Sequence, residues 1–317
     1  MLEELMVTLE RERGVHDWRV HQVWRESTQL YLVRRESENA LAAAGERLEV
    51  EVYNDHPAAQ DGAPSRGAAA VTILPSDATR LRERVQEAVA MAGLTDNPPY
   101  ALPGPAVYPQ VLTADRLLEV EPARVARQLA DQLLAAVAAE PDISLASAEF
   151  WVEREHDTLR NSRGVCAEQS ATSLLVDFVL LAQDPRRGEE MESHVEIRRR
   201  ALETLDLASE VRRQAQFARD ALVARTPATG RFPVMVSGEA ARHLLGGDGL
   251  SPLAFRSAAQ YKYQHLSPWE VGQSVFGDVT PTGDALTVYA NAVLPWGTRS
   301  AAFDVDGLPG QRLLLIE

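Results

Sequence analysis

The residues whose spacing comes nearest to a catalytic site are Glu239 and His243, in the segment Gly238-Glu-Ala-Ala-Arg-His243. Side chains four positions apart lie on one face of a helix, about one turn apart. Zinc proteases use this spacing, with two histidine ligands and a glutamate general base. Here Gly238 precedes the glutamate, and it has no side chain to bind a metal. Because a catalytic zinc usually takes about three protein ligands, we expect no metal in this chain and treat Glu239 and His243 as vestigial catalytic candidates only.

A second candidate is Cys166, the only cysteine, which could act as a nucleophile if His156 approached it across a hairpin. A free cysteine is more often a small, buried, apolar residue, and we expect that role here. A single cysteine also excludes an intramolecular disulfide and a cysteine-rich zinc site.

Two further groups of metal-binding residue types are weaker. The segment Glu192-Ser-His-Val-Glu196 is expected on a helix, where alternate residues point to different faces, so it predicts a charged surface. His56 lies near Asp55 and Asp61 in a segment rich in proline and glycine, and it is an equally weak ligand candidate.

The elements that would position these residues can be predicted from hydrophobic periodicity. Helical spacing predicts helices over residues 1–14, 77–92, 122–139 and 187–225. Alternation and short apolar runs predict two strands within 17–32, with a turn near Glu26, and further strands at 47–53, 68–74, 147–181, 232–236, 286–289 and 313–316. Residues 54–67 and the proline-rich 95–113 are predicted loops, 160–165 a hairpin turn, and 238–245 a short helix.

This order of elements predicts an α+β chain with two domains, residues 1–226 and 227–317. The net charge of −14 argues against a nucleic-acid partner, because phosphate binding needs clustered positive charge. The sequence contains no uninterrupted run of roughly 18 apolar residues, so no membrane span is predicted. Its acidic N-terminus is unlike a signal peptide. We therefore expect no membrane partner and a cytoplasmic location.

Three segments, taken in order, resemble the TldD/PmbA (TldE) family, whose members were formerly called modulators of DNA gyrase. Leu159–Gly164 resembles the family's N-S-x-G hairpin, and Thr229–Ala241 resembles its G-x-Y-P-V-V-L-x-P-x-A segment. Phe303–Pro309 resembles its F-D-x-E-G-x-P turn. The order and spacing of the three segments also agree with the family.

The resemblance implies an N-terminal α/β domain with an antiparallel-type sheet and long helices, a β-rich C-terminal domain, and assembly as a dimer. TldD-type subunits of the family are zinc metallopeptidases with a His-Glu-x-x-x-His helix, and TldE (PmbA) subunits lack that motif. Glu239 matches the general base and His243 the second histidine, but Gly238 replaces the first. The chain also stops at Glu317, before the later cysteine ligand of the protease subunit, so we expect an abbreviated second domain.

The resulting hypothesis is a non-catalytic TldE-like subunit, paired with a zinc-bearing TldD-like subunit or with itself, which acts on unfolded peptides. An open sheet edge can capture an extended peptide by main-chain pairing. The residues expected to serve peptide binding are Asn161, Ser162, Gly164, Val234 and Val236. Two alternatives remain: a metallopeptidase in its own right with an atypical metal site, and a structural homodimer with no proteolytic role.

Overall fold

The structure is a computed structural model that describes the chain except residues 59, 61, 246–257 and 281. It divides into two compact units. The first comprises Met1–Ala224 and Asn291–Gln311, and the second comprises Arg225–Ala290 and Arg312–Glu317. The division into domains 1–226 and 227–317 stays a prediction.

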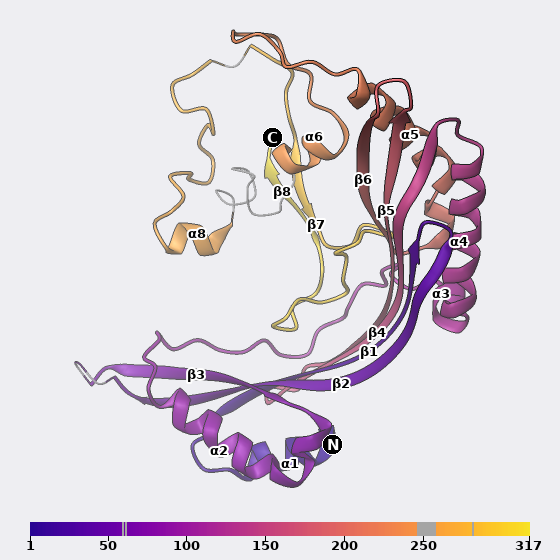
Figure 1. The fold of residues 1–317 in the computed structure, drawn as a ribbon. Helices are drawn as coiled ribbons and strands as arrows, with labels where there is room; N and C mark the ends of the chain where they lie inside the picture. Colours follow the sequence, from indigo (N-terminus) through magenta and orange to yellow (C-terminus); the bar gives the residue numbers. More distant parts are fainter. Residues whose placement is uncertain (59, 61, 246–257, 281) are drawn as a thin grey trace. The chain divides into compact units, whose positions relative to one another are not determined.

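The first unit is built on one antiparallel sheet of six strands in the order β3-β2-β1-β4-β5-β6 (Figure 1). The strands are β1 (Asp17–Val33), β2 (Glu36–Pro57), β3 (Pro64–Ile73), β4 (Ile143–Asn161), β5 (Cys166–Asp184) and β6 (Glu189–Arg199). The predicted turn near Glu26 is wrong, because Glu26 and Ser27 pair with Ala44 and Ala43 within one continuous strand. The predicted loop 54–67 is instead largely the ends of β2 and β3.

The described residues of the first unit also form the α-helices α1 (Leu2–Arg11), α2 (Leu81–Ala92), α3 (Arg116–Val120), α4 (Pro122–Ala138) and α5 (Leu207–Leu222). Short 3-10 turns cover Pro75–Arg80 and Leu202–Thr204. The predicted helix over 187–225 is wrong in its first part, which forms β6. There Val195 and Ile197 alternate with charged residues and pair with Phe178 and Val176 of β5. The apolar side chains therefore repeat every two residues, as in a strand, and not every 3.6 residues, as in a helix.

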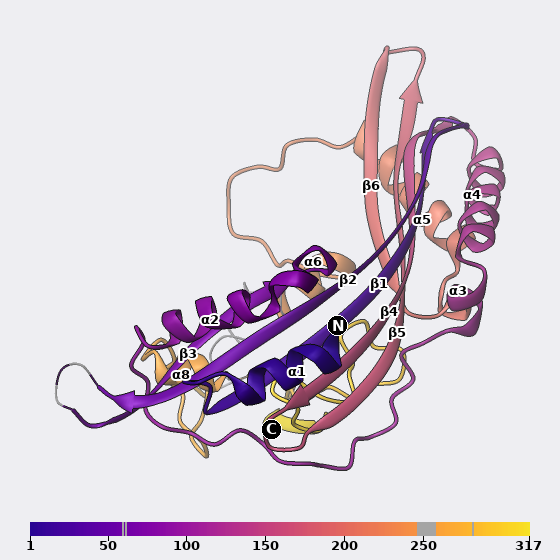
Figure 2. The same cartoon turned by 90° about the horizontal axis from the view of Figure 1, so that it is seen from below.

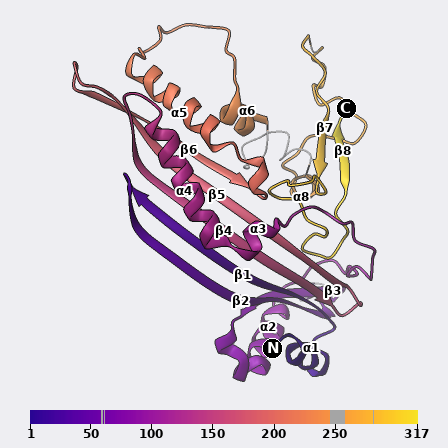
Figure 3. The same ribbon diagram turned by 90° about the vertical axis from the view of Figure 1, so that its right-hand side faces the viewer.

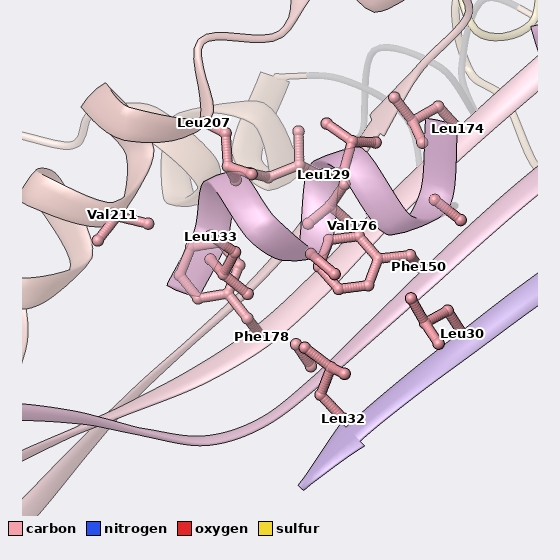
Figure 4. Packing of buried hydrophobic residues seen from close by; sticks show 14 of the residues in the cluster. Leu30, Leu32, Leu129, Leu133, Phe150, Leu174, Val176, Phe178, Leu207 and Val211 are labelled. Carbon is pink, nitrogen blue, oxygen red and sulfur yellow. The ribbon is translucent and has the colours of Figure 1, made fainter. Parts of the chain in front are cut away.

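The larger hydrophobic core lies between helices α4 and α5 and the strands β4, β5 and β6 (Figures 3 and 4). Phe150 and Phe178 are fully buried on the sheet, and Leu129 and Leu133 of α4 pack against them. Burying one such side chain contributes about 1.5–3 kcal/mol. This core therefore anchors α4 and α5 to one end of the sheet.

A second core lies at the other end of the sheet, where α1 and α2 cover β1, β2 and β3 (Figure 2). It includes Leu5 of α1, Val85 of α2 and Val20 of β1. Val20 in this core and Leu30 in the larger one are both even-numbered residues of β1, so both helix groups lie on one face of the sheet. The other face carries the odd-numbered residues of β1, among them Arg19, His21 and Arg25.

The second unit contains α6 (Gly238–Leu245), α8 (Ala259–Tyr263) and a two-stranded sheet of β7 and β8. Strand β7 covers Val288–Asn291, slightly later than predicted, and β8 covers Arg312–Ile316. The structure confirms the predicted α+β class. Within the described residues, no helix is long and apolar enough to cross a membrane.

Candidate functional site

The predicted zinc-protease-like helix is present as α6, Gly238–Leu245. Gly238 has a φ of +56°, a conformation that glycine adopts readily. His243 is exposed, and the side chain of Glu239 lies outside the part of the chain that the structure describes. Among the described side chains, no three of the types His, Cys, Asp and Glu lie close enough together to hold a metal ion.

The segment 232–236 was predicted to be a buried strand, and this is wrong. It has no regular secondary structure, and Val234 and Val236 are 78% and 42% exposed. Its apolar run was read as a core strand, but periodicity alone cannot show whether such a run is buried. This segment belongs to the second unit, and the predicted hairpin at 160–165 belongs to the first.

That hairpin turn is confirmed between β4 and β5, and Asn161 shapes it. The Asn161 Oδ1 accepts hydrogen bonds from the backbone N–H groups of Arg163 and Val165, both at 2.9 Å. Its Nδ2 donates to the carbonyl of Pro103 at 2.9 Å. Gly164 follows with a φ of +91°, which a residue with a side chain rarely adopts. Asn161 and Gly164 therefore fix the turn and tie it to the proline-rich crossing.

Ser162 connects the same turn to a buried carboxylate that the sequence reading missed. Its hydroxyl donates to Asp17 Oδ1 at 2.6 Å, and Arg163 and Arg66 donate to Asp17 Oδ2 at 2.8 and 2.9 Å. Burial raises the pKa of Asp17, but the hydrogen bonds from Arg163 and Ser162 outweigh it, and the pKa lies below its usual value. Asp17 is thus a buried anion that organises the turn.

Arg66 is the buried cation of this group. It pairs with both oxygens of Asp55, at 2.6 and 2.8 Å, and lies over the rings of Tyr53 and Tyr100. Burial raises the pKa of Tyr53 above its usual range, so its phenol stays protonated. Both carboxylate oxygens of Asp55 are therefore bound by Arg66, which argues against the predicted metal-ligand role of Asp55 with His56.

His56 itself contacts the Pro57 carbonyl at 3.0 Å and lies 3.7 Å from Asp96. The hydrogen bond to Pro57 raises its pKa, and the charge of Asp96 adds to this effect. The third member of the predicted group, Asp61, lies outside the described residues.

The turn that resembles the family's F-D-x-E-G-x-P motif packs directly on this hairpin. Gly307 has a φ of +90°, and a Cβ there would come within 2.9 Å of Leu159 and Val165. The carbonyl of Gly307 accepts a hydrogen bond from Tyr108 at 3.0 Å, and Phe303 packs in the same cluster. Two of the three segments that carry the resemblance are therefore neighbours in space.

The polar face of the sheet carries a His–Asp pair formed by residues of β1 and β4. His21 Nε2 is 3.3 Å from Asp157 Oδ1, and Gln169 donates to Asp157 Oδ2 at 3.2 Å. Gln169 Oε1 accepts from the backbone N–H of Ala302 at 2.8 Å, so the pair is tied to the Asn291–Gln311 segment. Burial raises the pKa of Asp157, but the hydrogen bonds from His21 and Gln169 outweigh it and lower the pKa below its usual value.

The same polar face holds a cavity of about 370 Å³ whose lining includes Arg25, Glu155 and Arg200. Arg25 is paired with Glu155. Arg200 donates to the carbonyls of Gly297 and Thr298, both at 2.9 Å. Burial lowers the pKa of Arg200, although nearby carboxylates oppose this shift. Arg200 therefore ties the 297–300 loop to the end of β6, while the Arg25–Glu155 pair joins β1 to β4.

The remaining predicted pairings are not formed. Cys166 is exposed, contrary to the expectation of a buried thiol. It pairs across the hairpin with Arg160, four residues from His156, which places the two side chains about 13 Å apart along the strand. His156 instead contacts the hydroxyl of Ser170 at 3.1 Å.

The Glu192–Glu196 segment lies on β6 rather than on a helix. Alternate residues of a strand share a face, so Glu192, His194 and Glu196 point the same way, contrary to the prediction. His194 is paired with Asp177 of β5 at 2.9 Å. The segment is a charged sheet surface, as expected, but for a different reason.

The whole chain shares its fold with solved structures of low sequence identity. TldE from Thermococcus kodakarensis matches with a TM-score of 0.73 and 16% identity, over 100% of this chain and 67% of its own. A candidate modulator of a DNA gyrase from Thermotoga maritima matches with a TM-score of 0.75 and 16% identity, over 100% of this chain and 69% of its own.

A second candidate gyrase modulator, from Bacteroides thetaiotaomicron, matches with a TM-score of 0.71 and 14% identity, over 99% of this chain and 68% of its own. No protein-family model and no curated protein matches the sequence. The fold implied by the three sequence segments is therefore confirmed.

Proposed function

We propose that this chain is a non-catalytic, TldE-like member of the TldD/PmbA family that completes a zinc metallopeptidase acting on unfolded peptides in the cytoplasm. The observation that carries the proposal is the glycine at position 238. The chain shares the fold of a solved TldE, and in the sequence resemblance Gly238 occupies the position of the first histidine of the protease motif. Zinc would then be held by a TldD-like partner.

A subunit without zinc can contribute by holding the substrate. In the described part of the first unit, the sheet ends at β6, whose outer edge has no partner strand. Its 11 residues span roughly 36 Å at about 3.3 Å per residue. An extended peptide added to this edge would be bound through its main chain, with little dependence on its sequence. Binding that depends little on sequence suits a complex that degrades unfolded chains.

The predicted peptide-binding residues then divide into two kinds. Val234 and Val236 are exposed and can contact a peptide directly. Asn161, Ser162 and Gly164 make hydrogen bonds within the chain or set the turn, so they support binding by shaping the hairpin.

Co-purification with a His-Glu-x-x-x-His protein from the same organism tests the proposal. We expect a stoichiometric complex that cleaves unfolded peptides and loses activity with a chelator. Glu239→Gln and His243→Ala in this chain should leave cleavage unchanged, whereas the matching changes in the partner's motif should abolish it. Zinc with chelator-sensitive cleavage in the purified chain alone would favour a peptidase in its own right. A homodimer that recruits no such partner would favour the purely structural role.

A further inference from the structure

A cavity of about 620 Å³ is lined by residues near the C-terminal end of α4 and by the turn that joins β1 to β2. This volume is within the range of roughly 300–1,000 Å³ found for small-ligand sites. One side of the cavity is apolar and is lined by Leu134, Val137, Ile143, Leu145, Ala146 and Leu181, whereas Ser144, Gln183 and Glu190 supply polar lining. Arg34 and Arg35 of the turn also line it.

The turn that carries the two arginines has an unfavourable conformation for its sequence. Val33 pairs with Glu36, so Arg34 and Arg35 form a two-residue hairpin turn in which only the first central residue has a positive φ, a position that favours glycine. Arg34 has a φ of +56°, a left-handed conformation that its Cβ disfavours. Its backbone N–H donates to the carbonyl of Ala146 in the cavity wall at 2.9 Å. Such strained positions cluster at binding sites.

The positive charges of Arg34 and Arg35 have no ion-pair partner among the described residues. Among the residues that the structure describes, neither the Arg34 nor the Arg35 guanidinium makes a hydrogen bond or an ion pair. Glu190 also lines the cavity, and its carboxylate accepts a hydrogen bond from Gln183 at 2.6 Å rather than pairing with either arginine. Two cations beside a cavity with an apolar side, in a chain with a net charge of −14, favour a ligand that joins an anion to an apolar group.

We propose that this cavity binds the C-terminal residue of a peptide, with its apolar side chain in the cavity and its carboxylate on Arg34 and Arg35. Arginine binds carboxylates through paired, charge-assisted hydrogen bonds. An acidic residue inside a peptide offers a carboxylate but no apolar group on the same residue, whereas a C-terminal leucine offers both. The inference rests on the peptide-binding function proposed above and assigns to it the recognition of a free chain end.

The test is a binding measurement by fluorescence anisotropy on the full chain, with an unstructured ten-residue peptide that ends in leucine. The peptide with a free carboxylate should bind about 10-fold or more tightly than its C-terminal amide, the effect expected from losing one charge-assisted hydrogen bond. A peptide ending in glycine should also bind more weakly, because it leaves the apolar walls uncovered.

The decisive variant replaces the turn by a pair that its backbone favours, Arg34→Gly with Arg35→Asn. It should lose the preference for the free carboxylate, while its unfolding midpoint stays equal or rises because the strain is relieved. Removing the same charge elsewhere, by Arg13→Gln with Arg127→Gln, should leave the preference intact. A variant that keeps the wild-type preference would overturn the inference.

Two further outcomes separate this inference from the function on which it rests. Equal binding of acid and amide peptides overturns the recognition of chain ends and leaves peptide binding standing. Binding of neither peptide, by the chain or by its complex, overturns both. Decanoate that binds more tightly than the leucine peptide would assign the cavity to a fatty acid and overturn the peptide occupant.

Discussion

Replacing Asp17 by alanine should destabilise the first unit by about 3 kcal/mol. Asp17 is 2% exposed, and its main buried partner is Arg66, whose side chain is 6% exposed. Removing one partner of a buried pair typically costs about 3–5 kcal/mol. Arg66 keeps its paired contact with Asp55, so the loss should lie at the low end of that range.

The matched control is Arg163→Ala, which removes another ion pair of the same carboxylate. Arg163 is 52% exposed, so solvent screening should make this pair contribute far less than the buried Arg66 pair. Urea unfolding followed by tryptophan fluorescence can separate the two cases, since Trp18 is buried beside Asp17. With a slope of about 2 kcal/mol per molar urea, Asp17→Ala should lower the midpoint by roughly 1.5 M and the control by far less. Equal shifts would refute the assignment of Asp17 as the centre of the network.

The same carboxylate predicts a dependence of stability on pH. The folded-state pKa of Asp17 is lower than its unfolded value near 3.8, so its contribution is complete above that value and is lost as the pH falls through the folded pKa. The difference in stability between wild type and Asp17→Asn should therefore be constant from pH 7 to 5 and shrink below about pH 4. A difference that grows on acidification would contradict the pKa direction.

Two further pairs of substitutions test the packing. Gly67→Ala should cost about 3 kcal/mol or more, because its Cβ would lie 1.8 Å from the carbonyl oxygen of Ala92, whereas Gly45→Ala, with open space around it, should be neutral or slightly stabilising in urea unfolding. Phe178→Ala should cost about 3–5 kcal/mol by leaving a cavity in the larger core, and Phe217→Ala, which is 54% exposed, should cost less than about 1 kcal/mol. Equal losses of stability for Gly67→Ala and Gly45→Ala would contradict the close approach of Ala92 to Gly67. Equal losses for Phe178→Ala and Phe217→Ala would contradict the burial of Phe178.

Several elements could be predicted because their signals are local. The hairpin turn at 160–165 follows from Asn161 and Gly164, whose side-chain bonding and positive φ need only the neighbouring residues. The helix that begins at Gly238 was predicted because Ser237 and Gly238 form a local capping signal at its start. Helix α4 was predicted almost to its ends, because its apolar residues recur at helical spacing along 17 residues.

The errors occur where local patterns permit two structures. In β1 the even-numbered apolar residues keep the same parity from Trp18 to Leu32, so a continuous strand was encoded, but the polar residues near Glu26 suggested a turn. In β6 the charged residues hid an alternation that only pairing with β5 reveals. The run 232–236 is apolar but exposed, and sequence alone does not show what covers a segment.

The sequence by itself determined which residue types could do chemistry, and above all that Gly238 cannot supply a zinc ligand. It also determined the turn at 160–165, because turn geometry depends on side chains close in the chain. Only the tertiary structure decided that Asp17 meets Ser162, 145 residues away, and that Gly307 packs on Leu159 and Val165. Contacts of this kind depend on how distant strands and loops are packed, and no local pattern records that packing.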